Sequence, residues 1–210
     1  MKGVIKELIA EKGRELAIMG IAIILVVAGT IAFHFYTQGG NPFVPEEITS
    51  NISKIDRSLS RGISIMEDAA NNLNELFRLE KEGNTSEVTQ KIFTYKNDLE
   101  KMREVFVDMP KDLQTVDDQV SQVRPRVAGK SLSEALNTAA QVAIELLRLR
   151  EDTIALYDGL EARIRGEETK GYNLMVDRAT NQGKLINSLY QGFQDAVSTF
   201  EDLTKENIDG

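Results

Sequence analysis

The chain contains no cysteine, no tryptophan, four prolines and a single histidine, His34, among its 210 residues. Without cysteine it cannot form disulfides, thiolate zinc sites, iron–sulfur clusters or a cysteine nucleophile. Beyond His34 there is no imidazole, so Ser-His-Asp triads, HExxH zinc sites and Glu-x-x-His di-iron sites are excluded from the rest of the chain. No GxxxxGK[ST] or GxGxxG segment is present for phosphate or dinucleotide binding. We therefore expect no enzymatic activity, no metal and no cofactor.

Basic residues are also fewer than acidic ones, 25 against 33, which gives a formal net charge of −8. An acidic chain repels phosphate backbones, so we expect no nucleic-acid partner. Several acidic residues are adjacent in the sequence, but neighbouring helical positions point about 100° apart and no calcium-loop spacing is present. We interpret these pairs as a solvated face. They are Glu67-Asp68, Asp117-Asp118, Glu151-Asp152, Glu167-Glu168 and Glu201-Asp202.

One long apolar run does occur, at residues 16–36, where 21 residues carry no formal charge when His34 is neutral. At about 1.5 Å per helical residue the run spans roughly 30 Å, the thickness of a bilayer's hydrocarbon core. We predict a single-pass transmembrane helix here, acting as an uncleaved signal-anchor. Basic residues precede the run and none follows it until Lys54. Residues 1–15 are therefore expected in the cytoplasm and the chain beyond the span on the extracytoplasmic side of the cell membrane.

Two alternatives for the apolar run remain open. A cleavable signal peptide would end at a small-residue site such as Val26-Val27-Ala28. The run is, however, longer than the usual apolar region of such peptides, about 7–15 residues. Pilin-type processing after Gly13 would leave Arg14 and Glu15 at the start of the mature chain, where an apolar residue is expected.

Aromatic side chains and the histidine cluster at the outer end of the predicted span. Amphipathic rings collect at the membrane interface because one end is apolar and the other is polar. We assign this interfacial role to Phe33, His34, Phe35 and Tyr36. Coordination of a haem or chlorophyll metal by the histidine is the alternative. Small residues within the span would let a second membrane helix approach, and these are Ala28, Gly29 and Ala32.

The chain beyond the span changes character twice. Residues 37–47 contain two adjacent glycines and two prolines and are predicted to form a spacer. From residue 48 to residue 210, apolar residues recur at three- and four-residue steps, the period of helices that pack through one face in heptad-like, coiled-coil-type seams. We predict an all-α protein in which the transmembrane helix is followed by an elongated antiparallel four-helix bundle. The seam of the last predicted helix consists of Leu185, Leu189, Phe193, Ala196, Phe200 and Leu203.

Glycine and proline indicate where these helices end. Turns are predicted at residues 82–86 and 166–171. Two alternatives stay open for the second turn: it could fall at residues 178–184, or residues 131–207 could form one long helix. Pro110 interrupts an otherwise continuous apolar series, and a kink or restart is expected there.

The start of the third helix is predicted from a capping pattern. Residues 124–130 are expected to form a loop whose basic groups face solvent. Ser131 would then cap the helix, with Glu134 at the capping-box position.

Five polar residues of the bundle are candidate sites of modification or binding. Asn84 and Asn51 begin Asn-x-Ser/Thr triplets and are possible glycosylation acceptors. Arg148, Arg150 and Arg163 are the places to seek an anionic ligand if the bundle is a sensor.

These observations favour a membrane-anchored extracytoplasmic interaction or structural module, such as an accessory or scaffold subunit of a membrane assembly. Its expected partners are the lipid bilayer, other membrane or envelope proteins, or further copies of the chain. The alternative is an extracytoplasmic sensory or ligand-binding domain that signals through a partner. Its expected layout is similar to that of the four-helix sensing domains of bacterial chemoreceptors and histidine kinases.

Overall fold

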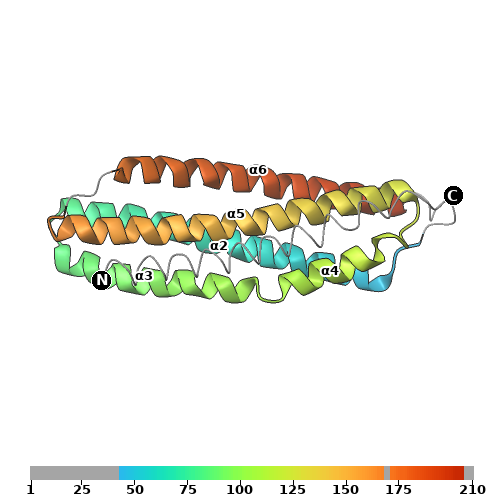
Figure 1. Cartoon of the computed structure of the whole chain (residues 1–210), viewed down its shortest axis with the longest axis horizontal. Coiled ribbons are helices and arrows are strands. Elements are labelled where there is room, and N and C mark those ends of the chain that lie inside the picture. The colour runs from blue at the N-terminus through green and yellow to red at the C-terminus, as the bar shows by residue number, and fades with distance from the viewer. Residues whose placement is uncertain (1–42, 168–170, 206–210) are drawn as a thin grey trace, which may run out of the picture. The chain divides into compact units, whose positions relative to one another are not determined.

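The computed structural model of the chain describes residues 43–167 and 171–205 (Figure 1). The predicted membrane span at residues 16–36 lies outside these ranges, together with the four interfacial residues 33–36. The small residues Ala28, Gly29 and Ala32 and most of the predicted spacer lie outside them as well. In the two described ranges, no helix is both long enough and apolar enough to cross a membrane.

Five helices account for most of the described residues, and no strand is found among those residues. In chain order they are α2 (Glu46–Lys81), α3 (Thr85–Val105), α4 (Met109–Val120), α5 (Arg126–Ile164) and α6 (Tyr172–Lys205) (Figure 1). An isolated β-bridge joins Phe43 to Arg124. The all-α prediction is therefore confirmed for this part of the chain. There are five helices because the second predicted segment is divided into α3 and α4.

Glycines with a left-handed backbone produce the turns that were predicted from the sequence. Gly83 has φ +80° between α2 and α3, and Gly166 and Gly171 have φ +75° and +82° between α5 and α6. Glycine adopts this conformation readily because it has no Cβ, and it therefore ends helices. The two alternatives for the last turn are wrong. A turn at residues 178–184 is contradicted because α6 runs without a break through them, and one long helix over residues 131–207 is contradicted because α5 ends at Ile164 and α6 begins at Tyr172.

Prolines mark two helix starts, of which only one was anticipated. Pro110 is the second residue of α4, where a missing N–H costs little, so the expected restart is confirmed. The predicted loop at residues 124–130 is wrong from residue 126 onward, because α5 begins directly after Pro125. The Pro125 carbonyl accepts from the Ala128 N–H at 3.0 Å. Ser131 consequently lies inside α5 rather than capping it, and its hydroxyl donates to the Ala196 carbonyl at 2.8 Å.

The chain divides into two compact units. The first contains the described residues up to 54, residues 110–140 and those from 192 onward, and the second contains residues 55–109 and 141–191. In the first unit α2 and α4 run antiparallel. Glu47 accepts from Gln119 at 2.7 Å, and Lys54 pairs with Asp112 at 3.9 Å.

The second unit contains four helical segments whose contacts establish their directions. Each helix is antiparallel to the next in the cyclic order α2, α3, α5, α6, which is the arrangement of an up-down-up-down bundle. Two contacts define each pair of neighbours. The contacts of α3 with its neighbours are Glu75–Lys91 and Gly62–Phe106 toward α2, and Lys96–Asp158 and Leu99–Arg150 toward α5. The contacts of α6 are Asp152–Arg178 and Glu145–Gln182 toward α5, and Phe77–Tyr172 and Asp56–Tyr190 toward α2.

The buried positions follow most of the predicted seams, with two corrections. Leu185 was placed in the core of the last helix but is 47% exposed, whereas Ile186 is 2% exposed. The inner line of α6 advances by seven residues, through Tyr172, Ala179, Ile186, Phe193 and Phe200. Asp117, assigned to a solvated face, is buried. It lies four residues after Leu113 and three before Val120, and so shares their inward face of α4.

Candidate ligand-binding groove

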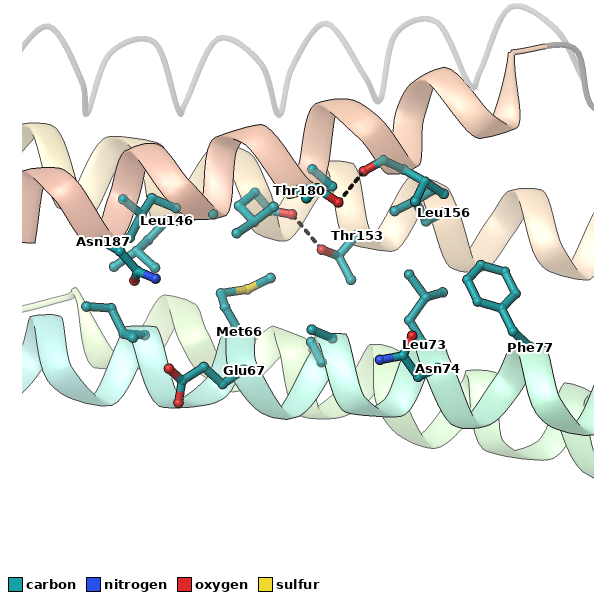
Figure 2. Close-up of a pocket in the computed structure, with 18 residues that line it drawn as sticks. Met66, Glu67, Leu73, Asn74, Phe77, Leu146, Thr153, Leu156, Thr180 and Asn187 are labelled. Atoms are coloured by element: carbon teal, nitrogen blue, oxygen red, sulfur yellow. Dashed lines mark hydrogen bonds between the residues drawn. The ribbon is translucent and has the colours of Figure 1, made fainter.

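The second unit contains an apolar groove of about 360 Å³ bordered by α2, α5 and α6 (Figure 2). Its α5 side is formed by Leu146, Leu149, Thr153 and Leu156. All four side chains are buried, so α5 forms the floor of the groove. The exposed lining residues belong to α2 and α6, which places the mouth between those two helices. The lining residues on these two helices are Ile63, Met66, Glu67, Ala69, Ala70, Leu73, Asn74, Phe77, Val176, Ala179, Thr180, Gly183, Ile186 and Asn187.

Small residues on α6 explain why the groove is open. Between residues 172 and 191 the helix buries only two side chains, Tyr172 and Ile186. The position midway between them on the inner line is Ala179, and Gly183 follows one turn later. A Cβ added to Gly183 would meet nothing within 4 Å. Side chains of this size cannot reach α2, so the space beside α5 stays unfilled.

The polar atoms of the groove wall are already bonded within their own helices. The Thr153 hydroxyl donates to the Leu149 carbonyl at 2.8 Å, and the Thr180 hydroxyl donates to the Val176 carbonyl at 2.9 Å (Figure 2). With these protons used, the wall presents mainly hydrocarbon. Figure 2 shows Met66 pointing from α2 toward α6. Such a surface suits an apolar ligand.

The rim, in contrast, is polar. Glu67 and Asn74 on α2 and Asn187 on α6 are exposed lining residues. The Glu67 carboxylate has neither a hydrogen bond nor an ion pair with any residue in the described ranges. It is turned outward to solvent in Figure 2. The groove therefore combines an apolar interior with one unpaired negative charge at its mouth.

Aromatic contacts close one end of the groove. The Phe77 and Tyr172 rings meet edge to face, with centroids 6.1 Å apart and an interplanar angle of 83°. The Arg163 guanidinium lies 5.2 Å from the centroid of the Tyr172 ring and pairs with Glu80 at 3.0 Å. Burial raises the pKa of the Tyr172 hydroxyl to about 12, an effect that the nearby Arg163 charge opposes.

Hydrogen bonds join α6 to α2 and to α5 at two other places. At the other end, the Tyr190 hydroxyl donates to Asp56 at 2.8 Å and accepts from Ser60 at 2.6 Å. On the α5 side, the Gln182 amide donates to the Glu145 carboxylate at 3.0 Å. These bonds hold α6 in place beside the open groove without filling it.

The arginines proposed for an anionic ligand are engaged by protein groups instead. Arg150 is 1% exposed, and its Nε donates to the Leu99 carbonyl at 2.8 Å while its other nitrogens pair with Glu100 and Glu151. Arg148 is exposed and pairs with Glu145 on its own helix. With Arg163 held by Glu80, none of the three arginines is directed into the groove.

The two asparagines of the glycosylation triplets differ in accessibility. Asn84 is exposed in the turn before α3, whereas Asn51 is buried in α2 and accepts from the Lys54 ammonium at 3.0 Å. Glycosylation of either residue stays a prediction. The described residues contain no group of three or more His, Cys, Asp or Glu side chains that could hold a metal ion.

Comparison of the chain with models of protein families, with curated proteins and with solved structures finds no match. The groove itself was not anticipated from the sequence. Its signal is the polar stretch at residues 178–184, which contains Gly183 and which was considered as a turn. A helix that continues through such a stretch buries little there, and this is where the groove lies.

Proposed function

We propose that this chain is a membrane-anchored extracytoplasmic helical bundle that binds a hydrophobic ligand in the groove of its second unit and acts through a partner rather than by catalysis. The anchor is the apolar run at residues 16–36, with residues 1–15 in the cytoplasm and a short spacer before an elongated antiparallel bundle. The single observation that supports the ligand-binding role is the groove between α2, α5 and α6.

Two properties of the groove support this proposal. Its volume of about 360 Å³ lies within the range of small-molecule sites, roughly 300–1,000 Å³. Its wall is apolar apart from two threonines whose hydroxyl protons bond within their helices. An unfilled apolar space costs packing energy, which a bound apolar ligand would recover.

The test is native mass spectrometry of the full-length protein purified from its host membranes. We expect a small apolar molecule bound at one copy per chain. Gly183→Leu, which places a side chain in the groove, should remove it. Ser188→Leu is the matched control, because it adds the same side chain at an exposed position of α6 outside the lining. Equal occupancy in the two variants, or none in the wild type, would contradict the proposal.

A second candidate is an accessory or scaffold subunit that docks a protein partner. It is favoured by two large apolar side chains on the surface, Phe93 on α3, which is 70% exposed, and Leu174 on α6, which is 73% exposed. Affinity purification of the full-length chain in mild detergent should then recover a partner at fixed stoichiometry. Phe93→Ser should weaken that recovery, whereas Asn97→Ser, one turn away on the same helix, should not. Recovery of the chain alone would exclude this role.

A further inference from the structure

We infer that the groove takes a single-chain amphiphile whose headgroup is positively charged, with the hydrocarbon chain lying between α2 and α6 and the head at Glu67. The inference rests on the proposed ligand-binding function and adds the chemical class of the ligand. Length, lining and charge each bear on it.

The length of the groove suits one extended hydrocarbon chain. Along α2 the lining runs from Ile63 to Phe77, which is about 21 Å at 1.5 Å per residue. A lipid chain spans one leaflet, about 15 Å or half of the roughly 30 Å hydrocarbon core. A space that is long for its volume accepts a slender chain and not a compact ring system or a double-chain lipid.

The wall offers an amphiphile's chain no competing polar partner. The hydroxyl protons of Thr153 and Thr180 are bonded within their helices, and Met66, Leu73 and Phe77 supply flexible or flat apolar contacts (Figure 2). Removing the methylene groups of the chain from water is favourable, so the chain supplies the affinity.

Charge at the mouth selects the head. Glu67 is exposed on α2 and has no hydrogen-bond or ion-pair partner among the described residues. The other exposed polar lining groups are the neutral amides of Asn74 and Asn187 and the bonded Thr180 hydroxyl. None of the described residues that line the groove is basic. An ammonium head would therefore be attracted to the mouth and a carboxylate head repelled, within a chain whose net charge is −8.

A tryptophan reporter tests this directly, because the natural chain contains no tryptophan. Phe77→Trp places the reporter in the groove wall, and Phe93→Trp places a matched one on the exposed surface of α3. Three probes with the same brominated alkyl chain and an ammonium, a neutral glycerol or a carboxylate head are added to the full-length protein in amphipol. Bromine quenches tryptophan on contact, so quenching reports the position of the chain.

We expect the ammonium probe to quench the groove reporter at the lowest concentration. The carboxylate probe should need a concentration at least roughly fivefold higher for the same quenching. The Phe93→Trp reporter should show no such difference. Glu67→Gln in the reporter background should bring the three probes to the same concentration dependence. If Phe77→Trp loses helicity, Leu73→Trp serves as the groove reporter.

Two results would overturn the inference. They differ in whether the proposed ligand-binding function, on which the inference rests, is refuted as well. Equal quenching by all three probes, unchanged by Glu67→Gln, would refute the charged head but leave apolar ligand binding intact. Absence of quenching with every probe, at groove reporters that fold, would refute both the ligand class and the proposed function.

Discussion

Arg150 allows a sharp test of what stabilises the second unit. Its side chain is among the largest fully buried ones in the described residues, at 1% exposure. Its Nε donates to the Leu99 carbonyl on α3 at 2.8 Å, and it pairs with Glu100 on the same helix. Glu151, which also pairs with Arg150, lies 3.6 Å from Arg103. Arg150 thus joins α5 to α3 from inside the bundle.

The expected cost of Arg150→Ala follows from three contributions. Truncating a large buried side chain to alanine leaves a cavity and costs about 2–5 kcal/mol. Losing a hydrogen bond from a charged donor costs about 1.5–3 kcal/mol, but the Leu99 carbonyl lies in a helix and keeps its backbone partner. The glutamates are partly exposed, at 49% for Glu100 and 35% for Glu151, so water replaces much of the lost pairing. We expect a net loss of about 3–4 kcal/mol in the free energy of unfolding.

A second variant separates the contribution of volume from that of charge. Arg150→Met keeps most of the buried volume and removes the charge, so we expect a loss of only about 1–2 kcal/mol. The measurement is urea-induced unfolding of the full-length protein in mild detergent, followed by far-ultraviolet circular dichroism. Arg148→Ala is the control, since that side chain is exposed and, among the described residues, pairs only with Glu145 of its own helix. Its stability should stay within about 0.5 kcal/mol of the wild type. If Arg150→Ala behaves like Arg148→Ala, the packing described for Arg150 is refuted.

Four further variants test other parts of the second unit. Gly183→Ala should stabilise the folded protein by about 1 kcal/mol, because alanine favours helix and nothing lies within 4 Å of the new Cβ. Gly62→Ala should instead lower the melting temperature, because its Cβ would lie 2.6 Å from the buried ring of Phe106. Equal effects of the two substitutions on the melting temperature would contradict this reasoning. Tyr190→Phe removes two hydrogen bonds between α6 and α2 and should cost about 1 kcal/mol, and an unchanged melting temperature would refute their role. The hydrogen bond from Tyr95 lowers the pKa of Glu75, so this carboxylate stabilises the fold above its unfolded pKa and the stabilisation is lost as pH falls through the folded pKa. In Tyr95→Phe the pKa of Glu75 should rise toward its ordinary value in a carbon-detected NMR titration, and an unchanged pKa would exclude Tyr95 as the cause.

Several features of the fold were readable from local sequence alone. Glycines at 83, 166 and 171 predicted the turns, because only glycine takes a positive φ at no steric cost. Pro110 predicted the restart at α4, because proline has no N–H to donate inside a helix. The three- and four-residue spacing of apolar residues predicted helices, because that spacing aligns side chains on one face.

Other features depend on which neighbour a side chain meets in space. Ser131 has the residue type and spacing of a cap, but its hydroxyl bonds to the carbonyl of Ala196, which is 65 residues away in the sequence. Arg150 has the same local signature as an exposed arginine, yet packing of α5 against α3 buries it. Leu185 and Ile186 are adjacent apolar residues, and the rotation of α6 against its neighbours decides which of them is buried.

The groove shows the same division between local and long-range information. Composition and spacing were enough to establish an acidic, helix-forming chain without cysteine and with one histidine, and to place the turns, since these follow from the chemistry of single residues and the period of the helix. A cavity requires that α2, α5 and α6 approach with Ala179 and Gly183 opposite larger side chains. That arrangement comes from burying the remaining apolar face of each helix, a long-range effect that depends on all of the helices together.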